Sequence, residues 1–510
     1  MEAIESKICS VPSKKLKPFK SEKAVESTAD RISALPKAVL HYILSFLDVR
    51  SAVQTSMLSK RWRYIWTTLP YLNFDHILFL AYGWNWGGEN LGMDQFLDLI
   101  DRVLFLRGGS HIQKFRLYCI RNYFDTGRLH TWTLVAARCN VEEVDIRVSA
   151  KEAVELPHCL YISESMSVLK LNLGSKRPKL VLPSSMGLPN LKILHLCSLC
   201  FVDDELTNKL LCNCPLLESL IIRYCTLKNV ENLKISAPRL KNLVIETCFE
   251  DSEVYEESGR SFSCKINVSA PNLISFKCRD HLKREYTLEN LYSLVNADID
   301  MYLEEDYDNE LLKLPHKRKE EYAQCMIKWL TGLSNIKALT LSDLLLKIVA
   351  EVPDVLENLP TSFFKSKYLK LKSGLSKDSI IAICYLLKHF TDIETLVLEI
   401  TKRVCRWHPM YQYGDETESN LPVIRAYWEA ELPEKCTLNH LKSVEIQNLL
   451  GYVNELMFLK FLLKRAMVLQ KIVINTSKTW PQDREERLMK FRKELQTFPQ
   501  ASSSVTILFI

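Results

Sequence analysis

Four cysteines form the group of side chains in this sequence that best suits metal chemistry. Cys197 and Cys200 are followed by Cys212 and Cys214, and thiolate pairs of this kind can bind zinc tetrahedrally. However, Cys197 falls on a predicted strand and the other three fall on turns between predicted repeat elements. We therefore interpret these residues as structural thiols and expect neither a metal site nor a cofactor.

Motifs of nucleotide-binding and hydrolytic enzymes are absent from the sequence. It has no P-loop, no G-x-G-x-x-G, no H-E-x-x-H and no G-x-S-x-G. Only 14 glycines occur in 510 residues, so phosphate-cradling loops are scarce. The sequence thus predicts a protein that is not an enzyme.

Composition and charge exclude further classes. The net charge of +6 is distributed over 67 basic and 61 acidic residues, whereas nucleic-acid-binding proteins concentrate basic residues in patches. The basic run Lys14, Lys15 and Lys17 is read as a solvated tail, with a nuclear-import signal as the alternative. Neither a membrane-spanning run nor a secretory leader is found, and the 16 cysteines suit a reducing compartment. We expect a nuclear or cytoplasmic protein without nucleic-acid or membrane partners.

The first ordered segment follows a polar stretch, residues 1–29, which is predicted to be disordered. From Pro36 to Leu47, apolar residues recur at helical spacing, and Pro36 suits the first turn. Asp48 is expected to cap a second short helix and Ser59 a third. Three short helices bury little surface by themselves, so their apolar residues resemble half of an interface.

A second pattern, apolar-x-x-apolar-x-apolar, recurs from about residue 110. Successive copies begin at Val141, Met166, Leu191, Leu217 and Leu240, in steps of 25, 25, 26 and 23 residues. This period is typical of leucine-rich repeats. Later copies are irregular; degenerate strands are expected near Ile299 and Leu371, a helix over Lys319–Leu330, and acidic loops over Glu250–Glu257 and Glu304–Glu310. The predicted fold is α/β: a leucine-rich-repeat solenoid with a curved parallel sheet and variable helices.

The N-terminal helices resemble an F-box, and the order of the segments resembles that of a plant protein family. The run Leu58-Ser59-Lys60-Arg61-Trp62-Arg63 is similar to plant F-boxes, and the segment from Trp428 to Val473 resembles the FBD domain that follows repeats in that family. The resemblance divides the chain into residues 1–29, an F-box at 30–75, repeats at 92–425 and an FBD domain at 426–510. One departure is Lys37, where many F-boxes have an acidic residue.

The resemblance implies that this protein is the substrate-recognition subunit of a Skp–cullin–F-box ubiquitin ligase. A Skp-type adaptor would bind the F-box and connect it to a cullin–RING core, and the partners would perform the chemistry. Filling of a local helical core is the alternative role for these apolar residues. The residues expected to bind the adaptor are Leu35, Pro36, Val39, Leu40, Ile43, Leu44, Leu47, Trp62 and Trp66.

Target binding is expected on the strand residues that point away from the core, because side chains alternate along a strand. Basic residues are frequent in the N-terminal half of this surface, which suggests an acidic or phosphorylated target segment. A surface of ordinary mixed charge is the alternative. The residues expected to bind the protein target are Arg116, Tyr118, Arg147, Lys170, His195, Arg223, Glu246, Lys277 and Arg279.

Two other functions remain open. The chain could be a repeat scaffold whose degenerate F-box no longer recruits a ligase, or a ligand-gated receptor that uses the concave repeat surface. Adaptor binding separates the first of these from the ligase receptor, and ligand-dependent target capture separates the second. The sequence does not identify the target, since specificity lies in variable surface residues.

Overall fold

The structure is a computed structural model of the 510-residue chain. It describes residues 35–81, 89–227, 230–247, 264–303, 314–333, 336–352, 354, 358, 365–375, 377–401, 438–476 and 484–510. The predicted tail, the two predicted acidic loops and Trp428 therefore lie outside the described residues. The chain divides into two compact units at Leu199/Cys200.

The first unit begins with short helices and continues as a parallel sheet. The helices at its start are α2 (Lys37–Leu44), α3 (Val49–Gln54) and the 3-10 segments η1 (Thr55–Met57) and η2 (Trp62–Thr68). Five strands then pair in parallel in chain order: β1 (Tyr71–Asp75), β2 (Lys114–Tyr123), β3 (Glu143–Ser149), β5 (Val168–Asn172) and β7 (Ile193–Cys197). Between them lie α4 (His76–Ala81), α5 (Glu89–Leu106), α6 (Thr126–Arg138) and α7 (His158–Tyr161), with the short pair β4 (Val154–Glu155) and β6 (Leu180–Val181).

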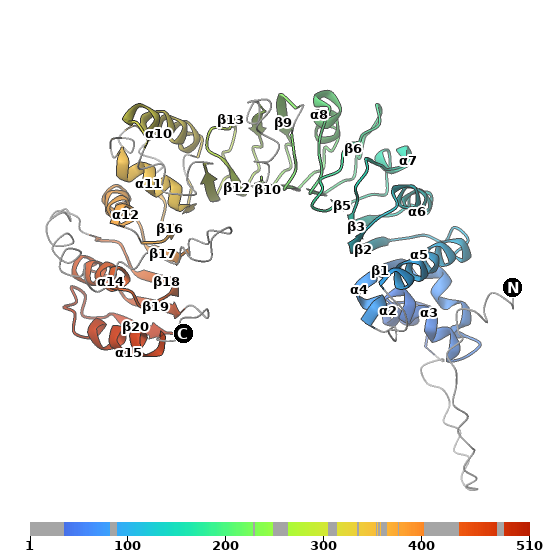
Figure 1. Cartoon of the computed structure of the whole chain (residues 1–510), viewed down its shortest axis with the longest axis horizontal. Coiled ribbons are helices and arrows are strands. Elements are labelled where there is room, and N and C mark those ends of the chain that lie inside the picture. Colours follow the sequence, from blue (N-terminus) through green and yellow to red (C-terminus); the bar gives the residue numbers. More distant parts are fainter. Residues whose placement is uncertain are drawn as a thin grey trace, which may run out of the picture. The chain divides into compact units, whose positions relative to one another are not determined.

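The second unit repeats the same arrangement. Its parallel strands also follow chain order: β8 (Ser219–Arg223), β10 (Asn242–Glu246), β12 (Ser275–His281), β14 (Asn296–Tyr302), β15 (Ala338–Leu341), β16 (Tyr368–Ser373), β17 (Thr395–Ile400), β18 (Ser443–Leu449), β19 (Lys471–Thr476) and β20 (Thr506–Phe509). The helices are α8 (Asp204–Cys212), α10 (His316–Thr331), α11 (Asp343–Glu351), α12 (Lys377–His389), α14 (Val453–Arg465) and α15 (Arg484–Leu495). Within each unit the helices lie on one side of the strands (Figure 1).

The repeated apolar triplets form the core, as the spacing predicts. Neighbouring strands pair in register, so that Leu220 lies beside Leu243 and Leu243 beside Phe276. All three side chains are at most 1% exposed. Stacking one repeat on the next therefore extends a continuous apolar layer, which a single repeat could not bury by itself.

Most strands and helices expected from the sequence are present. The degenerate copies are β14 and β16, the segment 319–330 lies within α10, and Asp48 caps α3 by accepting from the Ser51 backbone N–H at 3.3 Å. Three details differ from the expectation. Pro36 flanks the helix rather than opening it, and the third F-box segment is 3-10 rather than α-helical. The N-cap position of that segment is Arg61 rather than Ser59.

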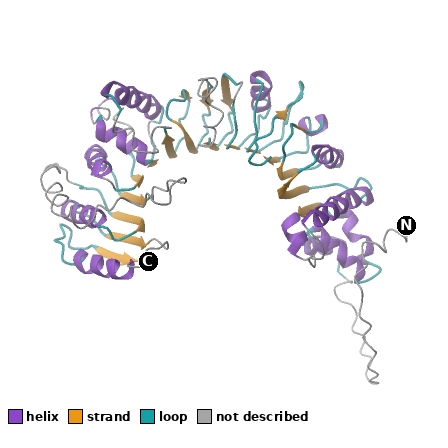
Figure 2. Cartoon of the chain, in the orientation of Figure 1, coloured by secondary structure: helices purple, strands orange, loops and turns teal. Residues whose placement is uncertain are grey.

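A second parallel sheet in the second unit was not expected. Strands β9 (Asn232–Ser236), β11 (Lys265–Ser269) and β13 (Tyr286–Glu289) form this sheet on the side opposite the main sheet, where other repeats have helices (Figure 2). The triplet Val230/Leu233/Ile235 carries the signal for β9. The Asn208 side chain of α8 covers the edge of β9 by accepting from the Lys234 N–H at 2.7 Å and donating to the Asn232 carbonyl at 2.7 Å.

The sheet is also longer than the predicted repeat region. Strand β1 lies directly after the F-box helices and pairs with β2, and β18 pairs with β17 in the same register as the earlier strands. Residues assigned from the resemblance to the F-box and to the FBD domain therefore contribute strands to the repeat sheet. No helix among the described residues combines the length and the apolar character needed to cross a membrane.

Candidate protein-interaction surfaces

The predicted adaptor-binding residues divide into a buried group and an exposed group. Leu40, Leu44, Trp62 and Trp66 are at most 8% exposed, so they form the core of the F-box, as the alternative interpretation held. Leu35 is half-buried. The members that reach the surface are Pro36, Val39, Ile43 and Leu47.

Further apolar side chains extend this exposed group. Tyr42 is 65% exposed and Phe46 72%, and their rings meet edge to face with centroids 5.0 Å apart. The i, i+4 spacing of Tyr42 and Phe46 is the sequence signal that favours this contact. Nearby segments of the F-box add the exposed Met57, Leu58 and Tyr64. We call Val39, Tyr42, Ile43, Phe46, Leu47, Met57, Leu58 and Tyr64 the F-box apolar surface.

Arg107 connects the F-box to the first repeats. Its buried guanidinium donates to the Leu69 carbonyl at the end of η2, and also to the carbonyls of Ser110 at 3.3 Å and His111 at 3.0 Å. Burial lowers the pKa of Arg107 to about 10, and it stays protonated at neutral pH. Together with the β1–β2 pairing, this side chain fixes the F-box against the sheet of the first unit.

Each unit has an open face, which we define as the side of the main sheet away from the helices. In the first unit, Asp145 is 8% exposed and lies between two arginines. Nε of Arg147 lies 3.1 Å from Oδ1 of Asp145, and Nε of Arg116 lies 4.0 Å from Oδ2 of the same residue. Tyr118, Lys170 and His195 lie half-buried on the same face. The structure therefore brings Arg116 and Arg147 together around a carboxylate.

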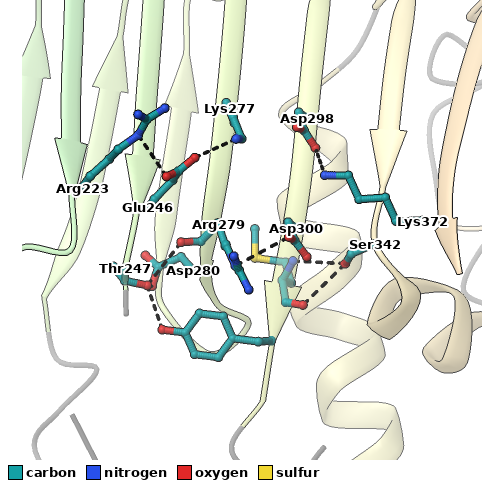
Figure 3. A network of polar contacts seen from close by, with 12 residues as sticks. Arg223, Glu246, Thr247, Lys277, Arg279, Asp280, Asp298, Asp300, Ser342 and Lys372 are labelled. Atoms are coloured by element: carbon teal, nitrogen blue, oxygen red, sulfur yellow. Dashed lines mark hydrogen bonds and ion pairs between the residues drawn. The ribbon is translucent and has the colours of Figure 1, made fainter. Parts of the chain in front are cut away.

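In the second unit, the predicted target residues form a denser network (Figure 3). Glu246, 7% exposed, holds Arg223 at 3.0 Å and Lys277 at 2.7 Å. Arg279 contacts Asp300 at 3.6 Å. Burial raises the pKa of Asp300, and Lys372 and Arg279 offset part of this effect.

Both signs of charge occur on this face: Arg223, Lys277 and Arg279 lie on β8 and β12, and Glu246 and Asp300 are their partners. Glu246 lies on β10 and Asp300 on β14, and the sequence pattern predicts both of these strands. Farther along the sheet, Lys372 contacts Asp298 at 2.8 Å and Lys370 contacts Glu399 at 2.7 Å. Cations and carboxylates thus occur together along the open face of the second unit.

A buried polar network fixes the end of β12 below Arg279. Asp280 is fully buried and accepts from Tyr286 Oη at 2.5 Å and from Thr247 Oγ1 at 2.8 Å. Arg284 Nε lies 2.8 Å from Oδ2, the oxygen that also accepts from Tyr286, and Asp280 raises the pKa of this guanidinium despite its burial. Thr247 also bonds to Tyr302 Oη at 2.8 Å. The network therefore ties together the ends of β10, β12 and β14.

The cysteines do not converge on a site within the described part of the chain. Cys197 and Cys200 are half-buried, Cys212 is exposed, and Cys214 is buried with its thiol on the Leu210 carbonyl. Among the described residues, no group of three or more histidine, cysteine, aspartate or glutamate side chains is placed to hold a metal ion.

Parallel strands at this spacing, with buried apolar triplets and helices on one side, define a leucine-rich-repeat protein. Comparison with known families adds three matches along the chain. Residues 32–74 match the F-box domain, residues 129–260 match the LRR repeats of the FBD-associated F-box protein At5g56370, and residues 432–474 match FBD.

Related proteins of Arabidopsis thaliana support the same assignment. The F-box protein At1g58310 is 30% identical over 388 residues, covering 72% of this chain and 73% of the relative. The F-box/LRR-repeat protein At3g58900 is 31% identical, and the match covers 61% of this chain and 94% of the relative. The F-box/FBD/LRR-repeat protein At2g26030 is 23% identical, and the match covers 94% of this chain and 99% of the relative. The chain belongs to the plant F-box/FBD/LRR-repeat protein family. Members of this family are generally non-catalytic adaptors, and no catalytic domain is indicated.

Proposed function

We propose that this protein is the substrate-recognition subunit of a Skp–cullin–F-box ubiquitin ligase, acting in the nucleus or cytoplasm. Its F-box would bind a Skp-type adaptor, and the repeats would bind the protein to be ubiquitinated. The observation that carries the proposal is the F-box apolar surface, because eight apolar side chains exposed on one small helical domain need a partner to leave water.

The geometry assigns different roles to the two groups of F-box residues. Leu40, Leu44, Trp62 and Trp66 are buried and hold the short helices together, whereas Phe46 and Leu47 are exposed and would contact the adaptor directly. Lys37 lies exposed at the start of α2, where it would face solvent or the adaptor. Binding energy in such an interface comes mainly from a few aromatic and aliphatic anchors.

The contacts of Arg107 between the F-box and the first repeats also suit a substrate-recognition subunit. A receptor of this kind contributes proximity, which requires that the adaptor and the target keep a defined orientation. A rigid connection between the F-box and the first repeats reduces the freedom of a target bound there. In this role Arg107 is a positioning residue, because its buried guanidinium joins the F-box to the first repeats.

Adaptor capture by the purified full chain tests the proposal. A Phe46→Ala/Leu47→Ala variant removes exposed side chains, so it should stay folded while affinity for a purified plant Skp-type adaptor falls about tenfold or more. A Met467→Ala/Met489→Ala variant is the control, since these residues are 57% and 71% exposed but far from the F-box in sequence. Leu44 is unsuitable for such a test because it is 1% exposed.

Two results would contradict the proposal. One is failure of the folded wild-type chain to capture the adaptor, which would favour the scaffold with a degenerate F-box. The other is equal weakening in both double variants, which would mean that the F-box apolar surface has no specific role.

A further inference from the structure

Strands β8, β10 and β12 carry an excess of positive charge on the open face of the second unit. Arg223, Lys277 and Arg279 are 38%, 40% and 43% exposed at their side chains. The same strands supply one open-face carboxylate, that of Glu246, whose side chain is only 8% exposed and lies beneath the cations it contacts. The neighbouring strand β14 supplies the next carboxylates, Asp298 and Asp300, in register with Lys277 and Arg279. Asp300 lies 3.6 Å from Nε of Arg279 and is also influenced by Lys372.

Glu246 fixes two of these cations without using all of their donors. Its Oε2 lies 3.0 Å from Nε of Arg223, and its Oε1 lies 2.7 Å from Nζ of Lys277. In Figure 3 the terminal nitrogens of Arg223 lie beyond Nε, on the side away from Glu246. A guanidinium held in this way keeps its planar pair of donors for another acceptor.

Farther along the open face of the second unit, on β16, two lysines are each paired with one carboxylate. Lys370 lies 2.7 Å from Glu399, and Lys372 lies 2.8 Å from Asp298. These lysines are 22% and 20% exposed, about half as much as the cations on β8 and β12. The positive excess therefore applies to strands β8, β10 and β12 themselves, since β14 beside them carries Asp298 and Asp300.

The backbone that carries Arg279 is held by the contacts of the next residue, Asp280. The next residue, Asp280, points to the opposite side of β12 and is held there by Arg284, Tyr286 and Thr247. Because this network fixes the backbone at the end of β12, the position of Arg279 is determined by the fold as well as by Asp300. Preorganised donors lose less entropy when a ligand binds.

We propose that Arg223, Lys277 and Arg279 form a docking surface for an acidic peptide segment of the target, with carboxylates as the recognised groups. The inference rests on the proposed function, because it assigns a chemical class to the target. Glu246 acts as a positioning residue, since its own carboxylate is covered. Ile221 and Val244, the neighbours of Arg223 and Glu246 along their strands, provide an apolar floor beside the cations.

The spacing favours an extended segment with several carboxylates over a single phosphate. Neighbouring strands lie about 4.8 Å apart, so β8 and β12 are separated by about 10 Å. Donors spread over that distance do not converge on one phosphate group. In an extended peptide, side chains on one side recur about every 6.7 Å, which allows alternate acidic residues to reach successive cations.

Fluorescence anisotropy with the full chain tests the inference. The probe is a labelled peptide in which glutamate alternates with alanine. A Lys277→Gln/Arg279→Gln variant leaves Arg223 paired with Glu246, and we expect its dissociation constant for the probe to rise about tenfold. The matched control, Lys370→Gln/Lys372→Gln, removes the same charge from the same face and should change it less than about twofold.

Each alternative outcome has a definite meaning. Equal weakening in both variants, or equal binding of a peptide with glutamine in place of glutamate, overturns the docking surface. Tighter binding of a peptide with a single phosphoserine overturns the carboxylate assignment. Adaptor capture measured on the same preparations separates the two hypotheses: capture without probe binding refutes only this inference, and probe binding without capture refutes only the proposed function.

Discussion

Glu455 illustrates how one buried side chain closes the turn between a strand and the following helix. Its carboxylate is 3% exposed and accepts from the backbone N–H groups of Leu450, Gly451 and Tyr452, at 2.6–3.2 Å. Burial raises the pKa of Glu455 to about 7, although these hydrogen bonds and Arg487 act in the opposite direction. A group of this kind links the stability of the second unit to pH.

The sign of the effect follows from proton binding. The folded state binds the Glu455 proton more tightly than the unfolded chain, whose pKa is near 4.5. The free energy of unfolding should therefore decrease as pH rises from about 4.5 to above 7, by on the order of 3 kcal/mol from this group. Denaturant unfolding of the wild type and of Glu455→Gln at both ends of this range measures the difference. Identical pH dependence in the two proteins would show that Glu455 does not titrate in this window.

At the scale of elements, a recurring left-handed turn ends the repeat strands. Gly174 (φ 91°), Ser198 (φ 53°) and Tyr224 (φ 54°) follow β5, β7 and β8 within two residues. At Gly174 a Cβ would lie 2.9 Å from Cα of Ser149 in the neighbouring repeat. Glycine is therefore required there by close approach as well as by conformation.

Gly174→Ala should lower the free energy of unfolding by about 1–3 kcal/mol, because the backbone of Ser149 must move and the φ angle is unfavourable for alanine. Gly187→Ala is the matched control, since a Cβ there meets nothing within 4 Å and its φ is not positive. Thermal and denaturant unfolding of the two variants provides the comparison. Equal destabilisation would refute the role assigned to the turn.

At the scale of the whole molecule, the C-terminal strands extend the repeat sheet. Strand β18 pairs with β17, and Val444 and Ile446, opposite Leu396 and Leu398, are completely buried. Residues of the FBD match therefore cover an edge that would otherwise expose unpaired backbone groups. Terminal units with this role are general in repeat proteins.

A chain ending at residue 401 should aggregate or unfold at a lower temperature, because the edge and apolar residues of β17 lose their cover. Size-exclusion chromatography and thermal unfolding measure both effects. A chain beginning at residue 30 is the control, since it lacks only the segment that the sequence predicts to be disordered. A monodisperse, equally stable C-terminal truncation would show that the last strands are dispensable for folding.

The sequence by itself determined the repeat architecture, because regularly spaced apolar triplets leave few ways to bury a parallel strand from every repeat. The resemblance likewise identified the F-box and FBD segments, which the family comparisons confirm. Strands β9, β11 and β13 were missed, since the triplet around Leu233 did not show which side of the repeat it occupies. For β1, Leu72 and Phe74 fall within residues 30–75, which the resemblance assigns to the F-box, so no repeat strand is expected there.

Only the tertiary structure decided which side chains are available for binding. Leu44 and Leu47 look alike in the helical pattern, but they are 1% and 38% exposed because packing against neighbouring segments covers one and not the other. The open-face charges show the same limit. Arg223, Glu246 and Lys277 are separated by more than twenty residues each, and their pairing depends on strand register and burial, which residue order alone does not specify.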